Sequence, residues 1–308
     1  MMDQRPCLAG VDWGTSSFRL WLFGRDGMVL AERRSAEGMS TLKPDQFEAV
    51  LYGHLSGAGG EGLPVILCGM VGAKQGWREA GYVDVPADLR AITAGTILVD
   101  GAGRDARILP GLAQRQLAHP DVMRGEETQL LGLLLDQPDF SGTVVMPGTH
   151  SKWVRLANGR VSGFATHLTG ELYAVLSQHS ILRQSVGAAG ATGVTDGFLR
   201  GLEITRSDPS AALSRLFTIR TRGLLFPDQG ADAADRLSGM LIGAEIAIAG
   251  ATVKAVTLVA DGRMAMLYTA ALSAAGIESK VAGADGLVRH GLWHAGTTIW
   301  PHLMGASA

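Results

Sequence analysis

The sequence lacks the marks of several protein classes. Its two cysteines, Cys7 and Cys68, each lie beside an apolar run, so we expect buried reduced thiols and neither a disulfide framework nor a metal site. No stretch approaches the roughly 18 uninterrupted apolar residues that span a membrane. The N-terminus has no long apolar segment followed by a small-residue cleavage site, so we expect a cytoplasmic protein.

Charge is sparse, at 18% of residues with a net charge of -2. Because this balance provides no basic surface for nucleic acid or for an anionic membrane, neither is expected as a partner. The eight histidines form no pair with metal-ligand spacing. The patterns GxxxxGKS/T and GxGxxG are both missing, which excludes the Walker and Rossmann modes of nucleotide binding.

Glycine is abundant, with 42 residues, and it recurs in one repeated pattern. Residues 11–27 (VDWGTSSFRLWLFGRDG) and 146–160 (MPGTHSKWVRLANGR) each hold an apolar lead-in, Gly-Thr, a serine two residues later, an alternating stretch and a glycine-containing turn. The repeat predicts an internal duplication. We expect two related domains facing each other, residues 1–115 and 116–308, with a C-terminal tail that could return to the first.

Hydrophobic periodicity and turn residues predict the elements around these motifs. The expected elements are a three-stranded meander over 7–35, a helix over 44–56, a buried strand over 65–68, short strands and loops over 77–110, a loop from 120 leading to a helix that begins near 125–126, strands over 143–146 and 152–156, helices from about 170 to 250, and a strand over 255–260 followed by a helix. This order predicts an α/β fold.

Both Gly-Thr loops are suited to binding phosphate. Glycine lets the backbone approach phosphate oxygens, successive N–H groups form an anion-binding nest, and hydroxyls add donors. One such loop could be a mere bend, but two in equivalent positions favour a clamp on a polyphosphate. The candidate residues are Gly14, Thr15 and Ser16 in the first copy and Gly148, Thr149 and His150 in the second.

Acidic residues accompany these loops. Asp12 precedes the first loop, whereas Met146 occupies its place in the second. A carboxylate beside a polyphosphate needs a cation between them, so Asp12 is predicted to hold Mg²⁺; the alternative is that it caps its own turn. Glu126 and Glu127 begin a predicted helix, where one of them could accept the proton of a hydroxyl during phosphoryl transfer. The helix macrodipole alone also favours acids there.

Several segments resemble known proteins. The hairpin DWGTSSFRLWLF, the second phosphate loop and a late LVADGRMAMLYTAAL resemble the actin, hexokinase and Hsp70 superfamily. That likeness implies two ribonuclease-H-like (actin-like ATPase) domains, with mixed β-sheets flanked by helices and a nucleotide cleft between them. More narrowly, GVDWGTSSFRLWL, CGMVGAKQGWREAGYVDVPA, RGEETQLLG, MPGTHSKWV and THLTGELYAVLSQHSIL, in this order, resemble the 2-dehydro-3-deoxygalactonokinase family over nearly the whole chain.

The resemblance implies that ATP and Mg²⁺ are used to phosphorylate 2-dehydro-3-deoxy-D-galactonate at its 6-hydroxyl, giving 2-dehydro-3-deoxy-6-phosphogalactonate and ADP in galactonate catabolism. It places Asp12 and the two Gly-Thr loops at the metal and phosphates, and Glu126, or else Glu127, at the catalytic position. The implied substrate residues are Gly69, Met70, Lys74, Gly170 and Glu171, and the implied adenosine residues are Ala260 and Gly262.

Two positions depart from the pattern of this family. Ala260-Asp261-Gly262 replaces two adjacent small residues, and Ala73-Lys74 replaces a serine followed by a basic residue. Lys74 could bind the carboxylate of a sugar acid or be a solvated loop lysine, and Trp77 is favoured as a core residue over a pocket residue.

The alternative functions are a kinase for another sugar or sugar acid, such as 2-keto-3-deoxy-gluconate, and a non-catalytic ATP-binding sugar sensor. The expected partners are the sugar acid and ATP, with room for a homodimer.

Overall fold

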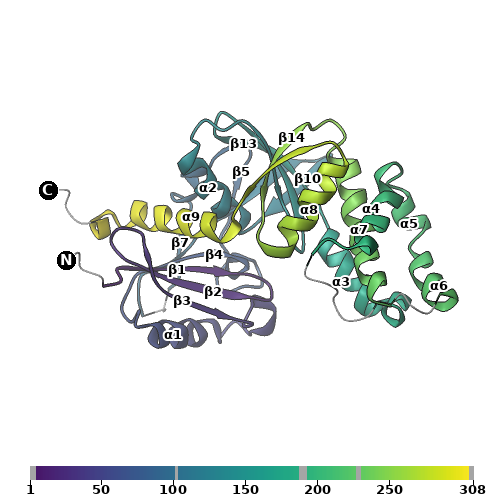
Figure 1. Cartoon of the computed structure of the whole chain (residues 1–308). Coiled ribbons are helices and arrows are strands. Elements are labelled where there is room, and N and C mark those ends of the chain that lie inside the picture. Colours follow the sequence, from purple (N-terminus) through teal and green to yellow (C-terminus); the bar gives the residue numbers. More distant parts are fainter. Residues whose placement is uncertain (1–4, 101–102, 187–192, 227–229, 305–308) are drawn as a thin grey trace. The chain divides into compact units, whose positions relative to one another are not determined.

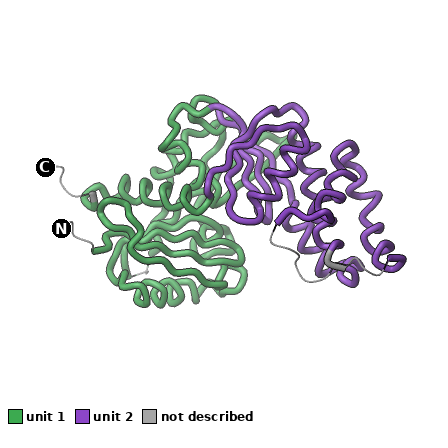
Figure 2. The backbone as a smooth tube through the Cα atoms, in the orientation of Figure 1, with its two compact units in different colours: residues 1–140, 157–163, 284–308 green, residues 141–156, 164–283 purple. Residues whose placement is uncertain are grey.

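The computed structural model describes residues 5–100, 103–186, 193–226 and 230–304. The chain divides into two compact units (Figure 2). The first comprises Met1–Phe140, Ala157–Gly163 and Ala284–Ala308, and the second comprises Ser141–Leu156 and Phe164–Gly283. The expected domain boundary after residue 115 falls inside the first unit, because a strand and a helix that follow it pack against elements of that unit.

The first unit is built on a six-stranded sheet in the order β3-β2-β1-β4-β8-β7 (Figure 1). Its strands are β1 (Leu8–Trp13), β2 (Phe18–Phe23), β3 (Val29–Ser35), β4 (Val65–Gly69), β7 (Ile97–Leu98) and β8 (Ala106–Ile108). Strands β1 to β3 form the expected antiparallel meander, and β4 joins β1 in parallel. The register places Asp12 opposite Arg19 on β2 and opposite Cys68 on β4.

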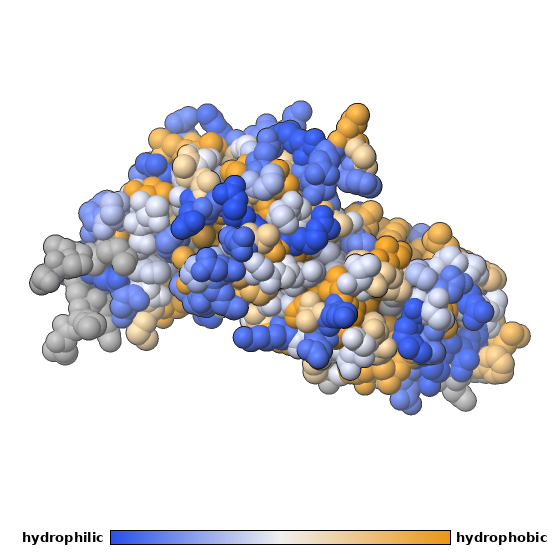
Figure 3. Space-filling view, turned by 90° about the horizontal axis from the view of Figure 1, so that it is seen from above, coloured by the Kyte–Doolittle hydropathy of each residue, from blue (hydrophilic) through white to orange (hydrophobic). Residues whose placement is uncertain are grey.

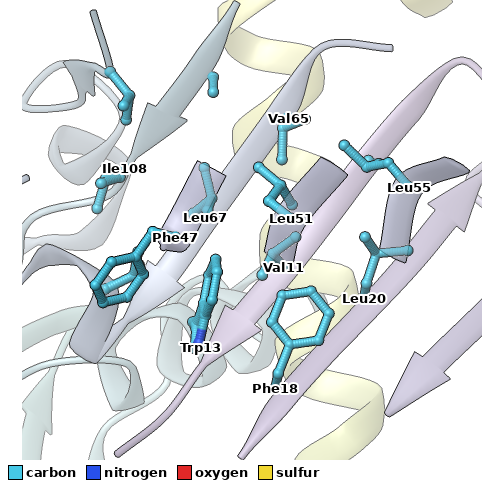
Figure 4. Close-up of a cluster of buried hydrophobic side chains, with 14 of the residues drawn as sticks. Val11, Trp13, Phe18, Leu20, Phe47, Leu51, Leu55, Val65, Leu67 and Ile108 are labelled. Atoms are coloured by element: carbon cyan, nitrogen blue, oxygen red, sulfur yellow. The ribbon is translucent and has the colours of Figure 1, made fainter. Parts of the chain in front are cut away.

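A hydrophobic core lies between this sheet and α1 (Phe47–Ala58), as Figure 4 shows. Because side chains alternate along a strand, Val11 and Trp13 of β1 point to the same face and are fully buried beside Phe47. Burial of each such side chain contributes about 1.5–3 kcal/mol. Trp77 packs on the same cluster with its ring stacked on Phe47, 6.3 Å between ring centroids, which confirms its expected place in the core.

The opposite face of the sheet is covered by α9 (Ala284–Ile299), and α2 (Glu126–Asp136) packs on α9. Two glycines, Gly132 on α2 and Gly291 on α9, allow the two helix backbones to approach closely. A Cβ atom at either position would collide with a backbone carbonyl of the other helix. This contact holds α2 beside the sheet and thereby determines where its N-terminus lies.

A smaller sheet of the first unit has the order β10-β9-β5, formed by β5 (Tyr82–Asp84), β9 (Gly111–Gln116) and β10 (His119–Met123). The expected loop from residue 120 is therefore wrong, because β10 is a largely exposed edge strand whose Pro120 and polar residues give little apolar alternation. Strand β6 (Ala87–Asp88) pairs with Arg160 and Val161, the first residues of β13 (Arg160–His167). Short 3-10 helices span Met39–Thr41, Met70–Gly72, Leu89–Ile92 and Pro301–Met304.

The second unit repeats the strand arrangement of the first. Its sheet contains β11 (Gly142–Met146), β12 (Ser151–Ala157), β13 (Arg160–His167), β14 (Ala255–Val259) and β15 (Glu278–Ala282), in the order β15-β14-β11-β12-β13. Residues 157–163, at the end of β12 and the start of β13, belong to the first unit. Strand β11 is antiparallel to β12 and parallel to β14, as β1 is to β2 and β4. The predicted duplication is therefore present in the topology.

Helices make up the rest of the second unit. They are α3 (Thr169–His179), α4 (Asp196–Arg206), α5 (Ala211–Ser214), α6 (Phe217–Leu225), α7 (Gly230–Ala249) and α8 (Gly262–Ala274), with a 3-10 helix at Ile181–Gln184. The helical stretch expected up to residue 250 is confirmed within the described residues, whereas 187–192 and 227–229 lie outside them. Tyr268 and Leu258 are among the buried side chains that join α8 to the sheet.

Cys7 and Cys68 are both buried free thiols, as predicted. Within the described residues, no helix is both long and apolar enough to cross a membrane. On the face drawn in Figure 3, apolar residues are interspersed with hydrophilic ones.

Candidate active site

In the first unit, the ends of β1 and β4 meet the start of α2. Gly69, the last residue of β4, has φ 89°, and a Cβ atom there would lie 2.7 Å from the Trp13 carbonyl oxygen and 3.1 Å from Asp12 Oδ1. Gly125, which precedes α2, has φ 109°, and a Cβ atom there would lie 3.4 Å from Gly69 Cα. Both positions therefore favour glycine, and they bring Asp12 next to the N-terminus of α2.

Asp12 forms an ion pair with Arg19, the residue opposite it on β2. Arg19 also pairs with Asp285 in the first turn of α9, so one guanidinium bridges two carboxylates. The side chain of Asp12 is 14% exposed. Its role in the structure is thus an ion pair across two strands, and not the capping of its own turn.

The predicted first phosphate loop follows Asp12 directly. Gly14 N donates to Ser17 O at 2.8 Å, which closes the turn between β1 and β2. Two backbone hydrogen bonds hold this loop in place, since Met39 N and Ser40 N donate to the Gly14 and Thr15 carbonyl oxygens, each at 2.9 Å. Thr15 and Ser16 are exposed, so their hydroxyls are available to a ligand.

The residues at this end of β1 fit a hard cation. Mg²⁺ prefers carboxylate oxygens and keeps several waters, and Asp12 presents a carboxylate immediately before a glycine loop. Arg19 neutralises the same carboxylate, so a cation bound there would share Asp12 with the guanidinium. The donor set is therefore suited to Mg²⁺ held through water and less suited to a closed, all-protein cage.

Glu127 is fully buried in the first turn of α2. Its Oε2 accepts a hydrogen bond from Gly125 N at 2.7 Å, and its Oε1 accepts one from the Thr128 hydroxyl at 3.2 Å. Burial, and then the charge of Glu126, raise the pKa of the Glu127 carboxyl from 4.5 to about 8. At neutral pH Glu127 is therefore mostly protonated.

Glu126 occupies a different environment. It is only half-buried, and its Oε2 accepts a hydrogen bond from Arg124 N at 3.1 Å. The two neighbouring acids thus differ in burial and in hydrogen-bond partners, and two carboxyl groups in different environments can have different tasks.

Cys68 links the two acidic positions. Burial first, and then the charges of Asp12 and Glu127, raise the pKa of the Cys68 thiol well above its usual value. Both carboxyl groups therefore lie within electrostatic reach of one sulfur atom at the end of β4. Asp12, Gly69 and the start of α2 form a single cluster inside the first unit.

The predicted sugar-acid loop leaves β4 at this cluster. Gly69 and Met70 lie at its start, and Lys74 is exposed further along it. Arg124 ties the far end of the loop to α2, because its Nη2 donates to Ala80 O at 2.7 Å and its guanidinium lies 4.4 Å from the centroid of the Tyr82 ring. Arg124 therefore supports both the far end of this loop and the start of α2, where the acid pair lies.

In the second unit, the loop of Gly148, Thr149 and His150 joins β11 to β12. Gly170 of α3 packs on it so closely that a Cβ atom there would lie 2.8 Å from Thr149 Cα. Glu171 N donates to Thr149 O at 2.9 Å, and its carboxylate contacts His150 Nε2 at 2.5 Å. The structure thus brings Gly170 and Glu171, expected at the substrate, against the second phosphate loop.

A cavity of about 120 Å³ lies beside this loop in the second unit. Its lining includes Gly148, Thr169, Gly170, Tyr173, Arg263 and Tyr268. The predicted adenosine residues lie at the end of β14, where Ala260 is buried and Gly262 begins α8 with φ 53°. Arg263, the next residue, reaches the cavity, so the second loop and the start of α8 lie close together.

The sequence matches a family model described as 2-keto-3-deoxy-galactonokinase over residues 12–295. The chain belongs to the 2-keto-3-deoxy-galactonokinase family. It is 50% identical to a probable 2-dehydro-3-deoxygalactonokinase of Rhizobium meliloti (strain 1021), covering 95% of this chain and 97% of that protein. It is 35% identical to the 2-dehydro-3-deoxygalactonokinase of Escherichia coli (strain K12), covering 92% and 94%. The resemblance stated from the sequence is confirmed.

Solved structures agree with this assignment. The crystal structure of a putative 2-dehydro-3-deoxygalactonokinase from Sinorhizobium meliloti has a TM-score of 0.91 at 50% identity, covering 96% of this chain and 97% of that one. Component A of the (R)-2-hydroxyglutaryl-CoA dehydratase of Acidaminococcus fermentans has a TM-score of 0.50 at 14% identity, covering 94% and 98%, which is a likeness of fold alone. The predicted α/β fold, with mixed β-sheets flanked by helices, is confirmed.

Sequence reasoning missed several charged residues of these regions. Arg19 interrupts the apolar strand FRLWLF, and Glu245 interrupts the apolar helix segment LIGAEIAIA, so a charge inside an apolar run was the available signal. Arg124 and Arg263 carry no comparable signal, because neither of them interrupts an apolar run. Their importance follows from partners that are remote in the sequence.

Proposed function

We propose that this chain phosphorylates 2-dehydro-3-deoxy-D-galactonate at its 6-hydroxyl, with ATP as the phosphoryl donor, in galactonate catabolism. The products are 2-dehydro-3-deoxy-6-phosphogalactonate and ADP. The observation that carries this proposal is the 35% and 50% identity to two proteins named 2-dehydro-3-deoxygalactonokinase over more than nine-tenths of the chain. The acid pair at the start of α2, with one fully buried and one half-buried carboxyl group, supports an enzyme over a non-catalytic sugar sensor.

Glu126 is the general base of this proposal. It accepts the proton of the 6-hydroxyl as that oxygen forms a bond to the γ-phosphorus and the bond from phosphorus to the ADP oxygen breaks. Glu126 suits this role because it is only half-buried at the start of α2, whereas Glu127 is fully buried and its pKa is raised by that burial. Glu127 holds Gly125 and thereby positions the first turn of α2.

The two Gly-Thr loops bind the nucleotide phosphates. Gly14, Thr15 and Ser16 act in the first unit and Gly148, Thr149 and His150 in the second, with Ala260 and Gly262 at the adenosine. Mg²⁺, held through Asp12, would neutralise charge on the phosphates. Exposed hydroxyls in the first loop and close packing of Gly170 beneath the second support these assignments.

Gly69, Met70 and Lys74 bind the sugar acid, with the Lys74 ammonium as the partner of its carboxylate. The exposure of Lys74 and the position of its loop beside the acid pair support this role. Gly170 and Glu171 were expected at the substrate as well. Their contacts to Thr149 and His150 favour a role in holding the nucleotide loop.

The test is an ADP-release assay on the purified chain and on Glu126→Gln. With the galactonate-derived acid as substrate, Glu126→Gln should lower kcat by about 10²–10⁴-fold, because a general base is lost, while ATP binding stays near that of the parent. Glu48→Gln is the matched control, since Glu48 is also in the first turn of a helix but is exposed and remote from the acid pair. Full activity of Glu126→Gln would remove Glu126 from the base role.

The same assay separates the alternatives. Comparable or faster turnover of 2-keto-3-deoxy-gluconate or of a neutral sugar would replace the proposed substrate, because closely built pockets differ by a few polar contacts. ATP binding without ADP release on any of these compounds would favour the sensor. A cytoplasmic location and a homodimer stay predictions.

A further inference from the structure

Two acidic residues of α7 are buried among the described residues of the second unit, Asp235 and Glu245, and Glu245 is the one beside the second phosphate loop. Glu245 is on α7 within the apolar segment LIGAEIAIA, and its side chain is 3% exposed. Burying an unsatisfied carboxylate costs several kcal/mol as an order of magnitude, so a protein tolerates one only where donors surround it. The donors around Glu245 therefore indicate what it holds together.

Four side chains donate hydrogen bonds to this carboxylate. Oε1 accepts from the Ser151 hydroxyl at 2.7 Å and from Trp153 Nε1 at 2.8 Å. Oε2 accepts from the Tyr268 hydroxyl at 2.7 Å and from the Thr169 hydroxyl. Burial, and then the charge of Glu245, raise the pKa of the Tyr268 phenol, so it keeps its proton and acts as a donor. A carboxylate accepts about four hydrogen bonds, and here each oxygen receives two.

These donors surround the loop of Gly148, Thr149 and His150. Ser151 follows the loop directly in the chain. Thr169 precedes Gly170, which packs against the loop backbone. Tyr268 and Thr169 line the same cavity as Gly148. One carboxylate on α7 thus joins the loop's exit strand β12, the start of α3 beneath it and the helix α8 beside it.

We propose that Glu245 is a positioning residue that holds this loop in the shape needed to bind the nucleotide, an inference that rests on the proposed use of ATP. Glu245 itself is buried and its carboxylate is hydrogen-bonded to Ser151 and Thr169, so in this proposal it acts through these residues. Loss of its carboxylate would therefore weaken ATP binding through the loop, without altering the acid pair or the sugar-acid loop, which belong to the other unit.

Glu245→Gln tests this with little change in volume. The amide nitrogen replaces one acceptor oxygen, so two of the four donors lose their acceptor and the hydroxyls among them have to turn. We expect the Kd for ATP, measured by titration calorimetry, and the KM for ATP to rise about tenfold. The KM for the sugar acid and the kcat at saturating ATP should stay within about twofold of the parent, because binding and chemistry are separable in this way.

A matched control addresses general loosening of α7. Thr205 of α4 is fully buried and its hydroxyl donates to Met240 O on α7 at 3.0 Å, but it has no contact with the loop. Thr205→Val should therefore leave the Kd for ATP unchanged. An equal rise in Kd for Thr205→Val and Glu245→Gln would overturn the positioning role, since any perturbation of α7 would then suffice.

A second variant covers the case in which Glu245→Gln does not fold. Thr169→Val removes one donor at the side nearest Gly170 and should raise the Kd for ATP severalfold in a folded protein. Normal ATP binding by Thr169→Val and by folded Glu245→Gln would overturn this inference and leave the proposed function intact. Failure of the unsubstituted chain to bind ATP would overturn both.

Discussion

The buried carboxyl of Glu127 makes the stability of the first unit depend on pH. Its folded-state pKa is about 8, raised by burial and by Glu126 from 4.5. Between these two values the unfolded chain releases the proton while the folded chain keeps it. Glu127→Gln removes the titrating group and keeps its size and its acceptor for Gly125 N, so we expect the variant to lose this pH dependence.

The magnitude follows from linkage. A raised folded-state pKa gives a contribution that is fully present below pH 4.5 and is lost as the pH rises toward 8. The loss is ~1.4 kcal/mol per pH unit, so it reaches on the order of 5 kcal/mol over the whole window. Between pH 5 and 7, the stability of Glu127→Gln relative to the parent should increase by about 3 kcal/mol. Any change in the free energy of unfolding that the amide causes independently of pH cancels in this comparison.

Urea unfolding of parent and variant at several pH values between 5 and 8 measures this difference. The free energy of unfolding of Glu127→Gln minus that of the parent should rise steadily with pH. Glu48→Gln is the control, since Glu48 is exposed in the first turn of α1, and its difference from the parent should be flat. A flat difference for Glu127→Gln as well would refute the reasoning, because Glu127 would then ionise as easily in the folded chain as in the unfolded one.

Two further substitutions probe the cluster at the ends of β1 and β4. Gly69→Ala should destabilise the protein by about 1–3 kcal/mol in urea unfolding and lower turnover, because it combines a φ of 89° with a Cβ atom 2.7 Å from the Trp13 carbonyl oxygen; unchanged stability would contradict the close approach. Asp12→Asn should raise the Mg²⁺ concentration needed for half-maximal turnover by at least about tenfold, because the charged ligand is lost. An unchanged Mg²⁺ requirement would remove Asp12 from the metal site.

Local signals explain which parts of the fold could be predicted from the sequence. The meander of β1 to β3 and the start of α2 depend on alternation, turn residues and a glycine before an acidic first turn, all contained in short windows. Strand β10 was missed because an exposed edge strand has little apolar pattern. The assignment of the C-terminal residues 284–308 to the first unit depends on α9 packing against β1 and α2, which no local window contains.

The candidate site could also be predicted only in part from the sequence. The glycines and acids were predicted because their residue types and spacing imply a chemistry, and the structure adds which acid is buried. Glu126 and Glu127 are neighbours in sequence, yet in the folded chain Glu127 is fully buried and Glu126 is only half-buried. A difference of one residue along a helix turns a side chain by about 100°, and the sequence alone does not say which direction faces the core.

The two hairpins show how a duplicated backbone acquires different side-chain chemistry. At the position two residues before the Gly-Thr pair, the first copy has Asp12 opposite Arg19, and the second has Met146 opposite Lys152. A basic residue is thus present in both copies, and the acid in one. The further partners differ more: Arg19 reaches Asp285 from the far end of the chain, whereas the second copy is anchored through Ser151 to Glu245 on α7. Because each anchor comes from a helix outside the repeated hairpin, the repeat predicts two loops of similar shape, whereas the contacts that hold each loop depend on the surrounding helices.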